Sequence, residues 1–239
     1  KHFKEYEEAV FAVSRLTEVL ILSPRQRTAF EKYYPGCEPR LHQVPPGISL
    51  DRRVDTIYKG MGTQLRTELG LALNTKLLLQ VGSGFRVKGV DRALRAMAAL
   101  PKPQLENCHY LLIGQDNPDR YLRLAKKLGI AEQFTVLPGR DDIPRFLAAA
   151  DLLLHPAYSE SAGYMLLEAT IAGLPVLTTS TCGYAFHIEH AESGLVCSYP
   201  FEQAQLNSYL ALMLGDLDTA DWSKNGLEYG KQDELYSQA

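Results

Sequence analysis

The stretch DLLLHPAYSESAGYMLLEATIAGLPVLTT (151–179) carries a strand, a helix and a second strand in succession. The apolar run DLLL (151–154) comes first, a helical segment near 162–172 follows, and PVLTT (175–179) closes the stretch. Apolar residues in both runs are continuous instead of alternating, which is typical of strands covered on both faces. The stretch therefore predicts a β-α-β unit whose two strands are parallel.

The same alternation of amphipathic helices and short apolar runs extends over most of the chain. It predicts helices near 55–70, 89–100, 118–128, 142–149 and 162–172, and strands at 76–82, 109–114, 133–139, 151–156, 175–179 and 194–198. The remainder from Phe201 is predicted to be helical. We therefore predict an α/β fold with a doubly wound parallel sheet of six strands.

The first 47 residues have a different pattern. They predict a helix over 1–16, a strand over 17–23, a helix over 25–34 that Ser23 caps and Pro24 opens, and a strand over 41–44. Pro-Pro-Gly (45–47) then ends regular structure. We predict that 1–47 is the end of a domain whose beginning is absent, 48–215 is the α/β domain, and 216–239 is a C-terminal helical segment.

Composition narrows the classes of function and compartment. A net charge of −3 gives no reason to expect nucleic acid as a partner. The four cysteines are widely spaced without a CxxC pair, so we expect reduced, mostly buried thiols in a reducing, cytoplasmic compartment. The histidine pair His187 and His190 lacks further ligands nearby, and we expect no metal site. No apolar run approaches the roughly 18 residues of a membrane span.

Ligands of open parallel sheets bind beyond the carboxyl ends of the strands, so the loops after the apolar runs are the candidates. The loop GSGFRVKG (82–89) joins glycines, Arg86 and Lys88 ahead of a helix, a combination that suits a diphosphate. It matches neither GxxxxGK[ST] nor GxGxxG, and an ordinary connecting loop is the alternative. In PGRDD (138–142), Arg140 can cover the face of a base, although a capped turn explains the residues equally well.

The segment ESAGYMLLE (160–168) places Glu160 before a helix and Glu168 about two turns into it. Eight residues of helix span roughly 12 Å, which exceeds the roughly 5–9.5 Å between the two acids of a glycosidase. A solvated helix face is one alternative. The other is one elongated ligand with a diol at each end and a diphosphate between them, which describes a nucleotide sugar. His155, just before this segment, either lines the cleft or packs internally.

At this point the motifs resemble a known family. The pattern E-x7-E, followed by EAxxxGLPV (168–176), resembles the C-terminal half of retaining glycosyltransferases of family 4, which have two Rossmann-like domains in the GT-B arrangement. The resemblance covers the chain from about residue 41 onward. The stretches VPPGI (44–48), KGVDRA (88–93) and AGLPVLTTSTCGYA (172–185) are similar to the branch that glucosylates a heptose of the lipopolysaccharide core.

The resemblance implies roles for individual residues. Glu160 would contact the donor sugar, Glu168 the ribose, Lys88 and Arg52 the diphosphate, and Arg140 the uracil. Ser83 stands where the family usually has an arginine, and Arg86 is expected to replace that charge. The implied set gives catalytic roles to Glu160 and Lys88, needs no metal ion, and binds the donor through Arg52, Gly82, Ser83, Arg86, Lys88, Arg140, Glu160, Ala162, Gly163, Tyr164 and Glu168.

The resemblance also implies a reaction. Glucose would pass from UDP-glucose to a heptose hydroxyl with retention, and the leaving phosphate would accept the acceptor's proton. Residues 1–47 would end the acceptor domain, whose missing part would contact the inner membrane peripherally. We therefore expect this chain to bind UDP or UDP-glucose with little or no transfer. The alternatives are a GT-B enzyme for another nucleotide sugar, a nucleotide-sugar epimerase of the same fold, and a non-catalytic nucleotide-sugar-binding module.

Overall fold

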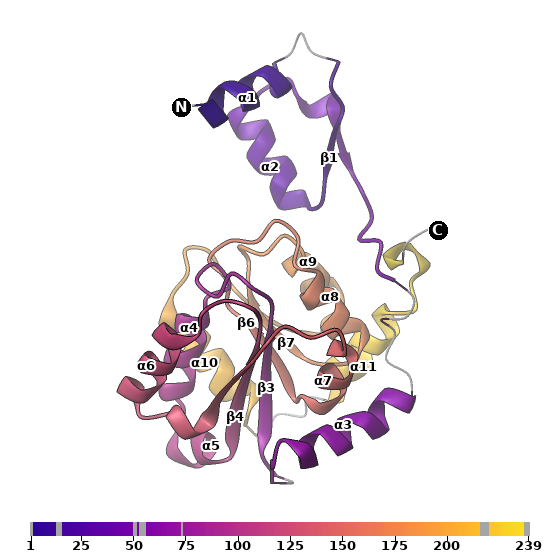
Figure 1. Cartoon of the computed structure of the whole chain (residues 1–239). Helices are drawn as coiled ribbons and strands as arrows, with labels where there is room; N and C mark the ends of the chain where they lie inside the picture. The colour runs from indigo at the N-terminus through magenta and orange to yellow at the C-terminus, as the bar shows by residue number, and fades with distance from the viewer. Residues whose placement is uncertain are drawn as a thin grey trace.

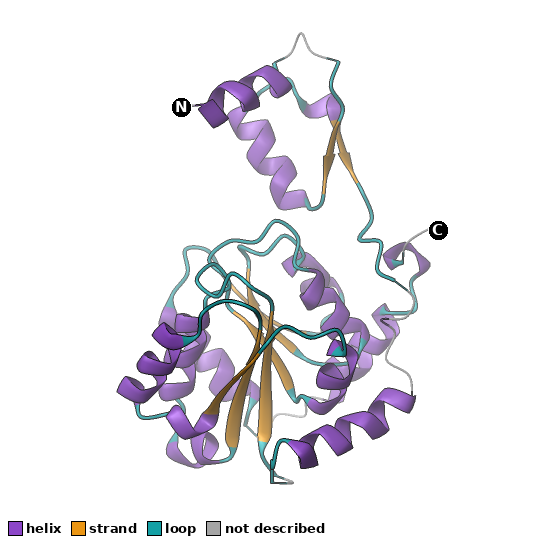
Figure 2. Cartoon of the chain, viewed as in Figure 1, coloured by secondary structure: helices purple, strands orange, loops and turns teal. Residues whose placement is uncertain are grey.

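A parallel sheet of six strands lies at the centre of the molecule. The computed structural model of the chain describes residues 2–12, 16–49, 52, 56–72, 74–215 and 220–236. Within them the strand order is β5-β4-β3-β6-β7-β8, and every pairing is parallel (Figures 1 and 2). The strands are β3 (Lys76–Val81), β4 (Cys108–Ile113), β5 (Phe134–Leu137), β6 (Leu152–His155), β7 (Val176–Thr179) and β8 (Gly194–Cys197). The predicted doubly wound, Rossmann-like sheet is confirmed.

Helices cover both faces of this sheet (Figure 1). One layer contains α4 (Val90–Ala98), α5 (Lys102–Glu106), α6 (Asp119–Leu128) and α10 (Gln203–Met213). The other contains α3 (Thr56–Glu68), α7 (Ile143–Ala149), α8 (Tyr164–Ile171), α9 (Ala185–His190) and α11 (Ala220–Tyr229). Two hydrophobic clusters result, one on each face of the sheet.

The central strand β3 shows why its sequence is apolar without interruption. Leu77, Leu78 and Leu79 are all fully buried. Leu77 and Leu79 belong to the cluster beneath α7 and α8, whereas Leu78 belongs to the cluster beneath α4 and α10. Because successive side chains point to opposite faces, a strand between two helix layers needs an apolar residue at every position.

The strand order reverses at the centre of the sheet. The chain leaves β3 for β4 and β5 on one side, returns to β6 on the other side of β3, and continues to β7 and β8. Strands β3 and β6 pair directly, with Leu78 opposite Leu152 and Leu79 opposite Leu153. The loops that follow β3 and β6 therefore lie beside the point where the strand order reverses, which is where open α/β sheets bind ligands.

The N-terminal residues form a small separate unit above these loops (Figure 1). It contains α1 (His2–Phe11), β1 (Val19–Ile21), α2 (Pro24–Tyr33), a 3₁₀ turn at Glu38–Arg40 and β2 (Leu41–Gln43), with β1 and β2 parallel. Ser23 caps α2 as predicted, accepting a hydrogen bond from the Gln26 amide. The Arg25 guanidinium donates to the Ser180 carbonyl at 2.8 Å, which connects α2 to the loop after β7.

Several boundaries differ from the sequence prediction. Helix α1 ends at Phe11, whereas the pattern predicted a helix to residue 16. The short helices α5 and α9 were not predicted, because five or six residues are too few to show a periodicity. The predicted boundary between 215 and 216 adjoins residues outside the described ranges, and the division into three segments stays a prediction. Ile48 bonds to the Leu235 carbonyl at 2.8 Å, which joins the start of the predicted α/β domain to the C-terminal segment.

All four cysteines are buried and unbonded to one another, as predicted. Among the described residues, we find no helix with the length and apolar character that a bilayer crossing requires.

Candidate active site

Three loops at the carboxyl edge of the sheet are joined by main-chain hydrogen bonds. They are the loop after β3 (82–89), the loop after β6 (156–163) and the loop after β7 (180–184). The Tyr158 amide donates to the Val87 carbonyl at 2.8 Å, and the Gly183 amide donates to the Glu160 carbonyl at 2.9 Å. The hydroxyls of Thr179 and Thr181 both donate to the Ala157 carbonyl. The three loops therefore form one connected rim.

Close approach of the first two loops depends on Gly89. Its φ is 72°, and a Cβ at this position would lie 2.1 Å from the Pro156 carbonyl oxygen. Only glycine adopts this left-handed conformation without a steric penalty and leaves room for the neighbouring main chain. The KG pair of the loop thus places Lys88 beside the segment that follows β6.

A buried polar network fixes the main chain at Lys88. Gln80 is fully buried in β3, and its side-chain amide donates to the Lys88 carbonyl at 2.7 Å. The Tyr110 hydroxyl of β4 donates to the other end of the same amide. Because buried polar groups are costly without partners, this pairing holds the loop in one position. Gln80 was not among the predicted site residues, although its polar side chain inside the apolar run KLLLQV was the available signal.

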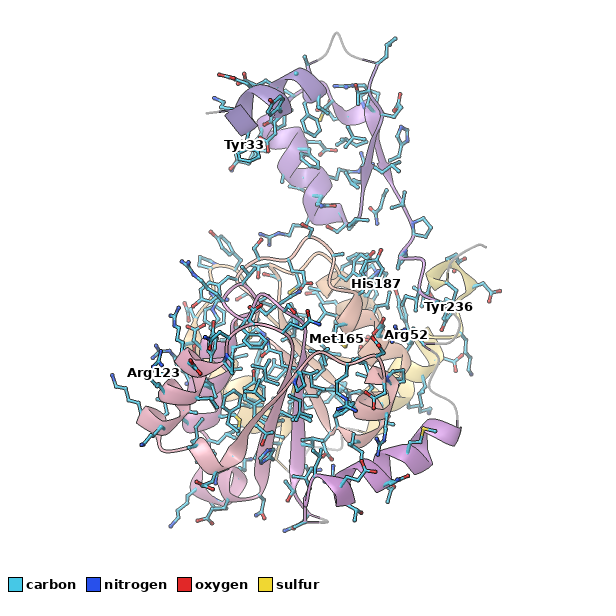
Figure 3. All side chains as sticks on the ribbon, viewed as in Figure 1. Tyr33, Arg52, Arg123, Met165, His187 and Tyr236 are labelled. Atoms are coloured by element: carbon cyan, nitrogen blue, oxygen red, sulfur yellow. The ribbon has the colours of Figure 1, made fainter. Side chains whose placement is uncertain are left out.

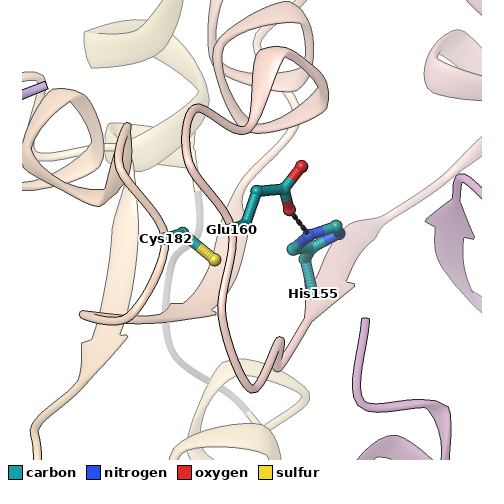
Figure 4. Close-up of side chains that lie close together, drawn as sticks. All are labelled: His155, Glu160 and Cys182. Carbon is teal, nitrogen blue, oxygen red and sulfur yellow. Dashed lines mark hydrogen bonds and ion pairs between the residues drawn. The ribbon is translucent and has the colours of Figure 1, made fainter. Parts of the chain in front are cut away.

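The Lys88 ammonium, the Glu160 carboxylate and the His155 imidazole form the centre of the site. Lys88 pairs with Oε1 of Glu160, and Nε2 of His155 lies 2.6 Å from Oε2 (Figure 4). The His155 side chain is fully buried, whereas those of Lys88 and Glu160 are 20% and 16% exposed. The predicted residues Lys88 and Glu160 are therefore brought together, with a buried histidine behind them.

The cluster favours the charged forms of its acid and its histidine. Burial opposes ionisation of Glu160, but hydrogen bonds and charges from His155 and Lys88 outweigh it and lower its pKa to about 2. Burial likewise lowers the pKa of His155, but Cys182 and Glu160 outweigh it and raise that pKa to about 9. Burial raises the pKa of Cys182, and the adjacent His155 more than reverses this effect.

His155, Glu160 and Cys182 are also the one group of possible metal ligands within the described ranges, with donor atoms less than 4.8 Å apart. The donor set fits a metal ion poorly, because Lys88 and His155 already occupy the two carboxylate oxygens of Glu160. A cation would have to displace the Lys88 ammonium from the same carboxylate. The expectation of a metal-independent site stays a prediction.

Helix α8 carries the remaining predicted residues of the E-x7-E segment. Gly163, with φ 110°, precedes Tyr164 at the start of the helix, and Ala162 is buried beneath them. Glu168 lies about one turn into the helix, with its carboxylate 4.0 Å from Nε of Arg52 (the arginine is labelled in Figure 3). Glu160 lies in the loop four residues before α8 begins, so Glu168 is one turn into the helix and not the two turns that the sequence predicted.

Arg86 and Arg140 both have charged neighbours that the sequence did not predict. Arg86 lines a pocket of 440 Å³ together with Arg120, Asp91 and Tyr158, so its surroundings already contain a second arginine and an acid. Arg140 makes a two-point ion pair with Asp142 at 2.7 and 3.0 Å. A site for uracil beside Arg140 would therefore have to compete with this pair for the guanidinium, and that role stays a prediction.

The remaining loop residues, Gly82 and Ser83, lie just after β3. Gly82 has a φ of 127°, and a Cβ there would come within 3.5 Å of the Lys88 side chain. The Ser83 hydroxyl accepts a hydrogen bond from the Gln115 amide at 3.2 Å, which joins this loop to the one after β4. Ser83 thus has a structural contact where the resembling family has an arginine.

Comparison with known proteins now gives the family. Residues 63–229 match the family described as Glycosyl transferases group 1. The chain belongs to this family. It is 42% identical over 239 residues to the lipopolysaccharide glucosyltransferase WaaG of Escherichia coli (strain K12), a match that covers 99% of the chain and 64% of WaaG. It is 33% identical over 189 residues to the D-inositol 3-phosphate glycosyltransferase of Nocardia farcinica (strain IFM 10152), covering 75% of the chain and 41% of that protein.

Solved structures agree with this assignment. The crystal structure of WaaG matches with a TM-score of 0.91 and 40% identity, covering 99% of the chain and 64% of WaaG. Anabaena HepE, solved with UDP and glucose, matches with a TM-score of 0.81 at 23% identity, covering 96% of the chain and 62% of HepE, and supports the fold alone. The chain thus has the fold of the C-terminal half of a GT-B glycosyltransferase. It spans less than two thirds of the length of these relatives.

Proposed function

We propose that the chain is the donor-binding part of a retaining, family 4 glycosyltransferase that transfers glucose from UDP-glucose to a heptose of the lipopolysaccharide inner core. The observation that carries the proposal is the pairing of Lys88 with Glu160 beside the point where the strand order reverses. The similarity to WaaG along almost the whole chain supports glucose and a lipopolysaccharide acceptor over other nucleotide sugars.

The geometry suits a donor with a diphosphate at its centre. Lys88 exchanges Glu160 for the diphosphate, the freed oxygen of Glu160 accepts hydrogen bonds from sugar hydroxyls, and Glu168 binds the ribose diol from one turn inside α8. Arg52 and the amide groups at the start of α8 add positive potential, so charge on the departing diphosphate is stabilised without a metal ion.

The resemblance to retaining glycosyltransferases implies the reaction. The bond between the anomeric carbon and the diphosphate oxygen breaks, and the bond to the acceptor oxygen forms on the same face of the sugar. The acceptor hydroxyl gives its proton to the departing phosphate oxygen, so no protein base is needed. The lipid-linked acceptor supports a peripheral position of the intact enzyme on the cytoplasmic side of the inner membrane, with the contact made by its N-terminal domain.

The proposal separates binding from turnover. The chain covers 64% of the length of WaaG, and acceptor binding belongs in our proposal to the N-terminal domain of the enzyme. We therefore propose that this 239-residue chain binds UDP and UDP-glucose but transfers little or no glucose by itself.

Calorimetric titration with UDP, UDP-glucose and ADP at fixed ionic strength tests the proposal. We expect uridine nucleotides to bind in preference to ADP, and Lys88→Met to weaken UDP binding by about tenfold or more, since a charge-assisted contact is lost. Lys102→Met is the matched control, because Lys102 is exposed on α5 and its ion pair among the described residues is with Glu106, one turn away. Preference for ADP would favour an enzyme for another nucleotide sugar, and absence of all nucleotide binding would contradict the proposal.

A further inference from the structure

Glu160 is held by two cations of different character. Lys88 approaches Oε1 from the glycine-bearing loop on a long, partly exposed side chain. His155 approaches Oε2 from the last position of β6 and has no exposed surface. Only one of the two can follow a ligand into the cleft, because the imidazole is enclosed by the sheet edge whereas the lysine stem is flexible.

His155 is fixed by the sheet as well as by its burial. It pairs in register with Thr178 of β7, and the Thr178 hydroxyl donates to the His155 carbonyl at 2.9 Å. Glu160 is fixed from the same side, since it forms an isolated β-bridge with Cys182 in the loop after β7. The distance between the imidazole and the carboxylate is therefore set by the packing of β6 against β7.

We propose that His155 is a positioning residue that holds Glu160 ionised, with one oxygen turned toward the donor sugar, when Lys88 moves to the diphosphate. This inference rests on the proposed function. With Lys88 withdrawn, His155 remains bonded to the carboxylate, and Oε1 becomes available to a sugar hydroxyl. The effect on the ligand is specific: His155 contributes to recognition of the sugar and not to recognition of UDP.

The charge on His155 has two opposing influences. The Glu160 carboxylate at 2.6 Å favours the imidazolium. Nδ1 of the same ring has no hydrogen-bond partner among the described residues, which disfavours a proton there. The other titratable groups that face the ring are Cys182 from the loop after β7 and, through Glu160, Lys88 from the loop after β3. Burial lowers the pKa of His155, and Cys182 and Glu160 together outweigh it and raise that pKa to about 9.

The test compares the ratio of UDP to UDP-glucose dissociation constants in three variants of the 239-residue chain. His155→Gln keeps an N–H donor for Glu160 but removes the charge, and His155→Leu removes both. His187→Gln is the matched control, because His187, on α9, is also a buried imidazole. Its Nδ1 lies 2.7 Å from the Tyr229 hydroxyl. We expect the ratio to fall about threefold in His155→Gln and about tenfold or more in His155→Leu, and to stay at the unmodified value in the control.

The pH dependence separates positioning from mere packing. In the unmodified chain the ratio should be constant from pH 6 to 8 and fall as pH rises through about 9, the raised pKa of His155. In His155→Gln this fall should disappear, whereas in Cys182→Ala it should persist but move to lower pH, because Cys182 is one of the two groups that raise this pKa. The imidazole resonances of His155, assigned by their absence in His155→Gln, should titrate well above the ordinary range near 6.5 in an NMR series.

The outcomes distinguish the two proposals. Failure of the unmodified chain to bind UDP contradicts the proposed function. UDP binding with equal affinity for UDP-glucose contradicts the positioning role, because Glu160 would then add nothing to sugar recognition. An unchanged ratio in the His155 variants, a ratio that falls equally in His187→Gln, or a His155 ring that titrates near 6.5 would each overturn it as well.

Discussion

The two glutamates of the E-x7-E segment are equally exposed and lie in different electrostatic surroundings. Each side chain is 16% exposed. Glu160 has Lys88 on one carboxylate oxygen and a buried imidazole on the other, whereas Glu168 has Arg52 at 4.0 Å. Equal exposure therefore does not identify a preorganised carboxylate, whereas the identity and rigidity of the cationic partners do.

The supports of the two acids also differ in origin. Glu160 depends on three loops that follow three different strands, because Lys88, Glu160 and Cys182 each come from a different one. Glu168 lies on one helix, where its carbonyl accepts the amide of Ala172, and its carboxylate contacts Arg52 of the segment before α3. Changes near Glu160 should therefore affect stability and binding together, and changes at Glu168 should affect stability less.

The largest effect should come from separating the loops around Glu160. A Cβ on Gly183 would lie 2.0 Å from the Ser161 carbonyl oxygen, so Gly183→Ala forces the loop after β7 away from the loop after β6. We expect a loss of about 3 kcal/mol in the free energy of unfolding, at the upper end of overpacking effects, measured by urea denaturation. Binding of UDP-glucose should weaken as well.

A second glycine provides the control for this change. Gly60 lies inside α3 with nothing within 4 Å of a built Cβ, so Gly60→Ala should leave stability unchanged or raise it by about 0.5–1 kcal/mol. Similar losses of unfolding free energy in Gly60→Ala and Gly183→Ala would show that the clash with the Ser161 carbonyl is not the cause of the loss at Gly183.

The pH dependence of stability should show the ion pair of Glu160. Its pKa is lowered to about 2, so its contribution is complete above about 4.5 and is lost as pH falls through 2. The pKa of His155 is raised to about 9, so the same coupling is complete below about 6.5 and is lost as pH rises through 9. We expect an optimum between about pH 4.5 and 6.5, with a contribution on the order of 2 kcal/mol.

Glu160→Gln should flatten this optimum. Without the carboxylate, the acid side of the profile is lost, and the imidazolium of His155 loses one of the two groups that favour it, Cys182 being the other. Unfolding free energies measured by urea denaturation from pH 3 to 9 should therefore vary less in the variant than in the unmodified chain. Two parallel curves would show that the pair contributes nothing to stability.

The sheet and the two acids could be predicted from local patterns, whereas the partners of the acids could not. Uninterrupted apolar runs such as KLLLQV report burial on both faces, and that information is local. The partnership of Glu160 with His155 and Cys182 depends on how β6 packs against β7 and on a β-bridge between distant loops. The sequence left His155 as either a cleft residue or a packed one, and the structure shows a buried residue that bonds to the cleft acid.

The partners of Arg86 and Arg140 could not be predicted from the sequence either. Their charge suggested phosphate and base contacts, and this is all that sequence can show, because a guanidinium binds whichever acid lies within reach. Arg140 lies two residues before Asp142 and pairs with it, while Arg86 shares a pocket with Arg120 and Asp91. Competing partners of this kind are decided by side-chain geometry.

A smaller effect is expected at Glu168, one turn inside α8. Glu168→Gln should weaken UDP binding by about tenfold, the loss of one charge-assisted contact to the ribose, with little change in the urea midpoint. The ratio of UDP to UDP-glucose affinity should stay constant, because Glu168 is proposed to bind the nucleotide and Glu160 the sugar. A change in this ratio equal to that in Glu160→Gln would remove the distinction between the two acids.

The smallest effect is expected at Arg140, whose ion pair is exposed. The side chains of Arg140 and Asp142 are 37% and 39% exposed, so solvent screens the pair and Arg140→Ala should cost no more than about 0.5 kcal/mol of stability. If Arg140 leaves Asp142 to cover uracil, the variant should bind UDP a few fold more weakly and bind ADP as before, measured by calorimetry. Arg123→Ala, at an exposed arginine of α6, is the control. Equal weakening of UDP and ADP binding would assign Arg140 to the diphosphate. Arg140 and Lys88 would then contact the same group of the ligand and differ only in how much each contributes to affinity.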